Sequence, residues 1–89
     1  MEKAIITTMG EDKVGIVYNV SKILYENNVN IIDISQKVFT DNIFSMIMLV
    51  QLNDNIDIAT LREKFTKLDI LNVKVFIQGT ELFKSMYEL

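Results

Sequence analysis

The sequence predicts an α+β domain, in which a four-stranded antiparallel sheet carries two helices on one of its faces. Three observations lead to this prediction. Some segments have the alternating, β-branched pattern of strands, others repeat apolar residues at helical spacing, and their order is strand, helix, strand, strand, helix, strand. The chain has 89 residues, of which 49 % are hydrophobic and 24 % charged. This composition fits one folded domain over residues 1–89 and excludes a disordered segment.

The first half of the chain predicts a strand, a helix and a second strand. Residues 3–9 are rich in β-branched apolar side chains and stop at Gly10. Residues 10–13 form a turn, in which the Asp12 carboxylate is expected to cap a helix over residues 14–27. The apolar stripe of that helix is Ile16, Val17, Val20, Ile23 and Leu24, and Val14, Ile16 and Val17 are expected in the core. Residues 30–39 alternate, with Ile32, Ile34 and Val38 on one face and Asp33, Ser35 and Lys37 on the other.

The second half predicts a strand, a helix and a final strand. Residues 40–42 form a hairpin turn, and residues 43–52 form a strand that is apolar on both faces. Asp57 is expected to cap a second helix, whose stripe is Ile58, Leu61, Phe65 and Leu68. Residues 72–78 alternate as a fourth strand. Residues 80–89 predict a short terminal helix with the apolar positions Leu82, Phe83, Met86 and Tyr87.

This order of elements is that of the ferredoxin-like βαββαβ sandwich, with the strands in the spatial order 4-1-3-2. In that architecture both helices cover the same face of the sheet. Because the third strand is apolar on both faces, we expect the other face to be covered as well, by the terminal helix or by a second subunit. Met46 and Met48 are interpreted as core or interface residues.

Composition narrows the possible functions. The absence of cysteine and histidine excludes thiolate metal sites and removes the usual general base. Nine basic and twelve acidic residues give a net charge of −3, a poor match for nucleic acid or an anionic membrane. We therefore expect no enzymatic activity, no metal and no cofactor. The first residues lack the pattern of a signal peptide, and the longest apolar run falls far short of the roughly 20 residues that span a bilayer, so we expect a cytoplasmic protein.

The turn between the first strand and the first helix carries a family resemblance. Its motif is Gly10-Glu11 followed by Asp12-Lys13-Val14-Gly15-Ile16-Val17, and the further matching segments are Asn30-Ile31 and residues 33–36 and 83–87. With these motifs the whole chain resembles the ACT domain, a small regulatory module that binds amino acids in many metabolic enzymes. It is most similar to the stand-alone ACT-domain proteins of a small uncharacterised bacterial and archaeal family. It more distantly resembles the glycine cleavage system transcriptional repressor. Many ACT domains have proline where Val14 stands, and this chain departs from the pattern there.

The same turn is the candidate ligand site. A helix N-terminus attracts a carboxylate, the Asp12 side chain suits an ammonium group, and glycines allow close approach to the backbone, so together they suit a free amino acid. The resemblance implies that Asn30 contributes from the neighbouring subunit of a dimer. The expected ligand-binding residues are Gly10, Glu11, Asp12, Val14, Gly15, Asn30 and Ile31. Structural alternatives stay open: Asp12 as a plain N-cap, the glycines as turn and packing residues, and Asn30 as a turn residue.

Two functions are compatible with these features. In the first, a stand-alone ACT domain binds a small metabolite, an amino acid by resemblance, at the interface of a homodimer and signals to a partner protein. In the second, the domain binds no metabolite and serves as a dimerisation or protein-interaction module, for example as a transcriptional co-regulator that acts through a partner. A screen for ligand-dependent thermal stabilisation separates the two, because a ligand that binds the native state raises its stability.

Overall fold

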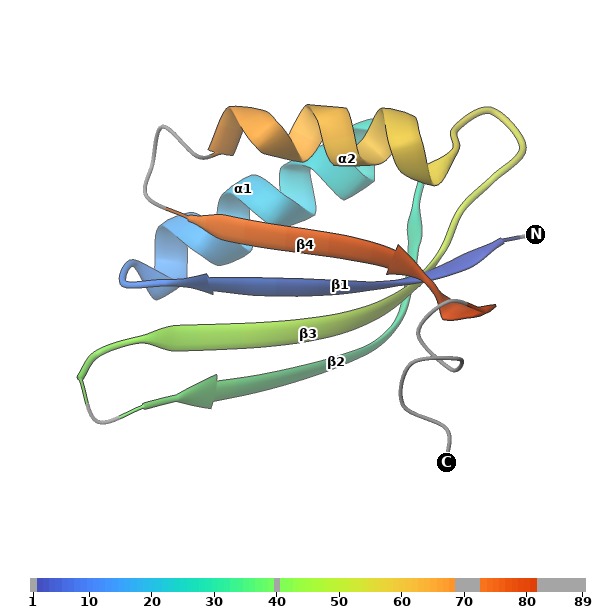
Figure 1. Ribbon diagram of the computed structural model, residues 1–89. Coiled ribbons are helices and arrows are strands. Elements are labelled where there is room, and N and C mark those ends of the chain that lie inside the picture. Colours follow the sequence, from blue (N-terminus) through green and yellow to red (C-terminus); the bar gives the residue numbers. More distant parts are fainter. Residues whose placement is uncertain (1, 40, 69–72, 82–89) are drawn as a thin grey trace.

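The computed structural model describes residues 2–39, 41–68 and 73–81. Its elements are β1 (Lys3–Gly10), α1 (Lys13–Glu26), β2 (Asn30–Val38), β3 (Phe44–Gln51), α2 (Ile58–Thr66) and β4 (Lys74–Gly79) (Figure 1). The strands form one antiparallel sheet in the order β2-β3-β1-β4, so the predicted 4-1-3-2 topology is confirmed. The predicted terminal helix over residues 80–89 lies, from residue 82 on, outside the described residues.

Both helices lie on the same side of the sheet, and the core fills the space between (Figure 1). Along β1 and β3 every second side chain points into this core, which is the alternation that the sequence predicts. No helix in the described part of the chain is both long enough and apolar enough to cross a membrane. The buried hydrophobic residues are Ala4, Ile6, Ile16, Val20, Leu24, Val29, Phe44, Met46, Met48, Val50, Leu52, Leu61, Phe65, Leu68, Val73 and Ile77.

Both predicted helix caps are confirmed. The Asp12 carboxylate accepts a hydrogen bond from the Gly15 N–H at 3.1 Å, and the Asp57 carboxylate accepts one from the Thr60 N–H at 2.7 Å. The hydrogen bond from Thr60 lowers the pKa of Asp57, because it stabilises the ionised carboxylate. At the other end of α1, Asn27 is the C-cap, which agrees with the predicted end of this helix.

The second strand is less protected than its pattern predicts. β2 is an edge strand whose nine residues are all exposed, since the helices lie over other parts of the sheet. The pairing of β2 with β3 is irregular between Ile31 and Asp33, where Ile32 is an extra residue. Ile34 and Val38 pair with Met48 and Phe44 and therefore share the helix side of the sheet. The bulge at Ile32 interrupts the simple alternation that the sequence predicts over residues 30–39.

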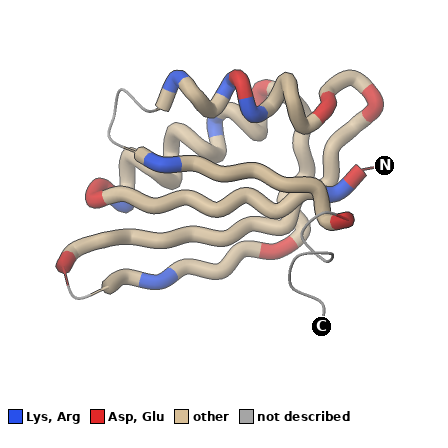
Figure 2. Tube along the Cα trace, in the orientation of Figure 1, with Lys and Arg blue, Asp and Glu red and all other residues tan. Residues whose placement is uncertain are grey.

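The side of the sheet opposite the helices, which we call the open face, carries a mixed set of side chains. The basic positions of β2 and β4 lie towards the end with the β1–α1 turn, and the acidic position of β2 lies towards the other end (Figure 2). The open face consists of Lys3, Ile5, Thr7 and Met9 of β1, Asn30, Asp33, Ser35 and Lys37 of β2, Ser45, Ile47, Leu49 and Gln51 of β3, and Lys74, Phe76 and Gln78 of β4.

Candidate functional site

The β1–α1 turn is built around the Asp12 cap. Besides its side-chain bond to Gly15, Asp12 accepts the Ile16 N–H on its backbone carbonyl at 2.9 Å. The first N–H groups of any α-helix have no acceptor within the helix. The Asp12 carboxylate accepts the hydrogen bond of the Gly15 N–H group. The N–H groups of Lys13 and Val14 remain as the donors that this end of the helix offers to a ligand.

Gly15 packs closely against the Asp12 cap. A Cβ atom added at Gly15 would lie 2.5 Å from Oδ2 of Asp12, so the carboxylate already occupies the space that a side chain would need. No glycine in the described part of the chain has a positive φ; the left-handed residues there are Asn28 and Asn42. Close packing against Asp12 fits one of the structural alternatives for Gly15, and the Asp12 carboxylate would have to shift to admit a side chain there.

A double-mutant cycle tests this contact. We expect Gly15→Ala to lower the free energy of unfolding of the parent protein by only about 0.5 kcal/mol or less, because displacement of the cap, which costs about 1 kcal/mol, is largely offset by the higher helix propensity of alanine. In an Asp12→Ala background the same change should raise stability by about 0.5–1 kcal/mol, since alanine then contributes only its higher helix propensity. Urea denaturation of the four proteins measures the coupling. Equal effects of Gly15→Ala in both backgrounds would show that Asp12 and Gly15 do not interact.

Val14 is not in the core, contrary to the prediction. It is 79 % exposed, whereas Ile16 is fully buried and Val17 half-buried. Each helical residue advances about 100°, so Val14 lies roughly 200° around the helix from Ile16 and points away from the sheet. With Lys13, Val17 and Tyr18 it lines an open hollow of about 360 Å³ beside the turn. This hollow is an apolar surface next to the free N–H groups.

Two acidic residues stand in the turn just before the hollow. Glu11 and Asp12 are both exposed, and they present two carboxylates within one short connection. The Lys13 ammonium lies 5.7 Å from the centre of the Phe44 ring, a cation–π contact that draws it toward β3. Gly10, Glu11, Asp12, Val14 and Gly15 lie together at one end of the molecule, because they are neighbours along the chain. No cluster of three or more metal-ligating side chains occurs within the described residues.

Asn30 and Ile31 do not join this cluster within one chain. In the sheet Gly10 pairs with Phe44, and Phe44 pairs with Val38 at the end of β2. Asn30 begins β2 and lies about eight residues away along that strand, which corresponds to roughly 25 Å. A site that combines the turn with Asn30 therefore requires a second chain.

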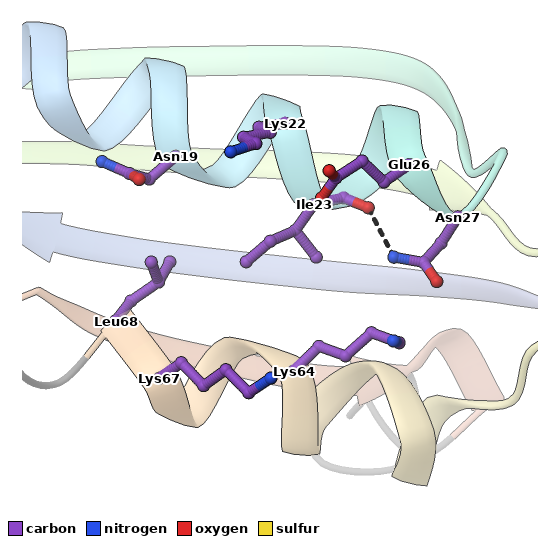
Figure 3. A pocket seen from close by; sticks show the side chains of 8 residues that line it. All are labelled: Asn19, Lys22, Ile23, Glu26, Asn27, Lys64, Lys67 and Leu68. Atoms are coloured by element: carbon purple, nitrogen blue, oxygen red, sulfur yellow. Dashed lines mark hydrogen bonds between the residues drawn. The ribbon is translucent and has the colours of Figure 1, made fainter.

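A groove between α1 and α2 was not predicted from the sequence. It encloses about 420 Å³, and its side chains come from both helices (Figure 3). The amide of Asn27 donates to the Ile23 carbonyl at 2.7 Å, and that of Asn19 donates to the Gly15 carbonyl at the same distance. The sequence signal that could have predicted the groove is the spacing of polar residues three and four positions apart on the two helices. The groove is lined by Asn19, Lys22, Ile23, Glu26, Asn27, Lys64, Lys67 and Leu68.

Comparison with known proteins shows to which family the chain belongs. A family model for the ACT domain matches residues 2–76. A UPF0237 protein of Methanocaldococcus jannaschii is 43 % identical over the whole of both chains. A UPF0237 protein of Clostridium perfringens is 44 % identical over 97 % of this chain and 98 % of the relative.

Solved structures agree with this assignment. The ACT domain protein from Streptococcus pneumoniae is 44 % identical, with a TM-score of 0.80 over 97 % of this chain and 98 % of that one. A putative glycine cleavage system transcriptional repressor has a TM-score of 0.76 at 14 % identity; it covers 88 % of this chain, which corresponds to 46 % of the repressor, and shows likeness of fold alone. The sequence motifs, the βαββαβ topology and these relatives lead to one conclusion: the chain belongs to the ACT-domain family, among its UPF0237 members.

Proposed function

We propose that this protein is a non-catalytic regulatory domain of the cytoplasm, which binds a free amino acid at the β1–α1 turn and passes the signal to a partner protein. The observation that carries the proposal is the placement of three chemically different surfaces at one helix end. The N–H groups of Lys13 and Val14 suit a carboxylate, and the carboxylates of Glu11 and Asp12 suit an ammonium group. The hollow at Val14 and Tyr18 suits an apolar side chain.

The Asp12 cap limits the kinds of ligand that can bind at this helix end. Because Asp12 already holds the Gly15 N–H, a simple anion would meet a carboxylate at the helix end and be repelled by it. A zwitterion avoids this repulsion, since its ammonium group can approach Asp12 while its carboxylate approaches Lys13 and Val14. The geometry thus favours a free amino acid over phosphate or a dicarboxylate.

A second subunit would complete the site. β2 is an edge strand with unpaired backbone groups and exposed apolar side chains, which favours pairing with another strand. In an antiparallel pair of two β2 strands, Asn30 of the partner subunit would come near Val38, in the same row of the sheet as Gly10. The hollow lies on the side of α1 turned away from the groove with α2, which is the side of β2. A homodimer of this kind brings Asn30 and Ile31 of the partner subunit towards the turn.

A protein-interaction module without a metabolite is the second candidate. The exposed stripe on α1 favours it, because Val14, Tyr18 and Tyr25 are 61–83 % exposed at helical spacing and suit an apolar partner surface. A thermal-shift screen of the twenty free amino acids separates the candidates. Saturable stabilisation by one of them supports a sensor. Absence of any shift at millimolar concentrations would favour the interaction module.

We expect Asn30→Ala to weaken the amino acid found in that screen about 5- to 150-fold, because a lost hydrogen bond in a desolvated site costs about 1–3 kcal/mol. Isothermal titration calorimetry measures the effect. The matched control is Asn55→Ala, which removes the same amide from an exposed loop position. Unchanged affinity of the Asn30→Ala protein would show that Asn30 is a turn residue and that no site spans the two subunits.

A further inference from the structure

The groove between α1 and α2 has an apolar floor and a polar wall on α1. That wall consists of Asn19, Ile23 and Asn27, which follow one another at four-residue spacing and therefore share one side of the helix. Leu68, just after α2, is 6 % exposed and points towards α1, so that it forms the floor together with Ile23 (Figure 3). The groove lies on the other side of α1 from the hollow of the candidate ligand site, and is a separate surface.

The charges in the groove are unevenly distributed between its two walls. Lys64 and Lys67 belong to α2 and its C-cap, and Figure 3 shows their side chains extending along the groove. On α1, Lys22 and Glu26 stand four residues apart, and their opposite charges offset each other. Three lysines and one glutamate leave the groove with a net positive charge, located on the α2 wall, although the whole chain has a net charge of −3. This wall attracts anionic groups.

Two side-chain amides on the α1 wall are held in fixed orientations. The amide nitrogen of Asn19 donates to the Gly15 carbonyl, and that of Asn27 donates to the Ile23 carbonyl, both at 2.7 Å. An amide also has a second N–H group and a carbonyl oxygen, with which it can donate to and accept from a peptide backbone. The two asparagines lie eight residues apart on the helix, or about 12 Å, a distance that an extended peptide covers in roughly four residues.

We propose that the groove between α1 and α2 binds an extended, acidic peptide segment of a partner protein. The backbone of this segment pairs with the amides of Asn19 and Asn27, and one of its apolar side chains lies on the floor. Its carboxylates meet Lys64 and Lys67. A nucleic acid or a polyphosphate fits less well, because its charge continues along the whole groove and meets Glu26 on α1. The proposal names the surface that receives the partner of the proposed function, and it rests on that function for the signalling role alone.

A titration followed by nuclear magnetic resonance tests the groove directly. The probe is an acetylated peptide in which two glutamates stand on each side of a leucine, added to the isotope-labelled full chain at low ionic strength. We expect saturable changes in the amide chemical shifts of the groove residues and none at Val14 or Tyr18, on the other side of α1. The same peptide with glutamine in place of each glutamate should cause no such changes, because it lacks the complementary charge.

Charge variants identify the wall that holds the carboxylates. Lys64→Gln with Lys67→Gln should weaken the glutamate peptide about 5- to 30-fold, since two partly exposed charge pairs are lost. The matched control is Lys3→Gln with Lys74→Gln, which removes the same charge from exposed positions of the sheet and should leave the affinity nearly unchanged. Lys64→Glu with Lys67→Glu should create affinity for a peptide with lysine in place of each glutamate, which the parent protein does not bind.

Three outcomes would overturn the proposal. The first is the absence of a saturable shift with the glutamate peptide at millimolar concentration. The second is an equal loss of affinity in the two double glutamine variants, which would show that net charge alone attracts the peptide. The third is tighter binding of tripolyphosphate than of the peptide at the same residues, which would make the groove a site for small anions. Because no amino acid is added in these titrations, a failed amino-acid screen and a failed peptide titration are distinguishable.

Discussion

Phe44→Ala is expected to lower the free energy of unfolding by about 3–5 kcal/mol, through lost burial and the cavity left behind. Phe44 is 1 % exposed, pairs with Gly10 and lies beneath Lys13, so its ring supports the turn that forms the candidate site. Domains of this size have a total stability of roughly 5–15 kcal/mol, so the variant should be close to unfolding at physiological temperature. Equilibrium denaturation in urea measures the change.

Tyr25→Ala is the control for this truncation. Tyr25 also carries an aromatic ring but is 83 % exposed, and its removal should change stability by about 0.5 kcal/mol or less. A loss below about 1 kcal/mol for Phe44→Ala would contradict the packing described for the β1–α1 turn, because a fully buried phenylalanine would then contribute no more than a surface residue.

Thr8→Val is expected to stabilise the protein by about 1–2 kcal/mol. Thr8 is fully buried on the helix side of β1, where it pairs with Met46 and Val75, and its hydroxyl has no hydrogen-bond partner among the described residues. A buried polar group without a partner costs about 1–3 kcal/mol, and valine has the same shape without the hydroxyl. The melting temperature and the urea midpoint should both rise.

Thr7→Val provides the comparison on the neighbouring residue. Thr7 is half-buried on the open face, where solvent can reach its surroundings, so this change should have a much smaller effect. Destabilisation by Thr8→Val would mean that the hydroxyl is hydrogen-bonded in solution, for example to a trapped water, and that burial leaves no polar atom unsatisfied at this position.

The element order, the two caps and the core were predictable because they rest on short-range patterns. Alternation along residues 43–52 placed Phe44, Met46, Met48 and Val50 on one face, and the structure buries all four. Asp12 and Asp57 stand directly before periodic apolar stripes, and each accepts a hydrogen bond from the N–H three residues ahead. Such features depend on a few neighbouring residues, so no knowledge of distant contacts was needed.

Other features depend on which elements meet in space. The predicted strand order already places β2 at an edge, but only the structure shows that the helices lie over other strands and leave all nine of its residues exposed. Val14 belongs to an apolar segment that suits the core, and only the direction in which α1 faces the sheet shows it to be exposed. The contact that fixes Gly15 is with a carboxylate, which its place in the motif did not reveal.

The candidate site also combines features that the sequence predicts with features that only the tertiary structure shows. By itself the sequence determined the fold class and the cluster at the β1–α1 turn. The residues of that cluster are close along the chain, and one helix start holds them together: Gly10, Glu11, Asp12, Val14 and Gly15. Only the tertiary structure decided that Asn30 lies at the opposite end of the sheet, and that a groove opens between α1 and α2. Separation along a strand and helix coverage are set by long-range packing, and a pattern of neighbouring residues does not encode them.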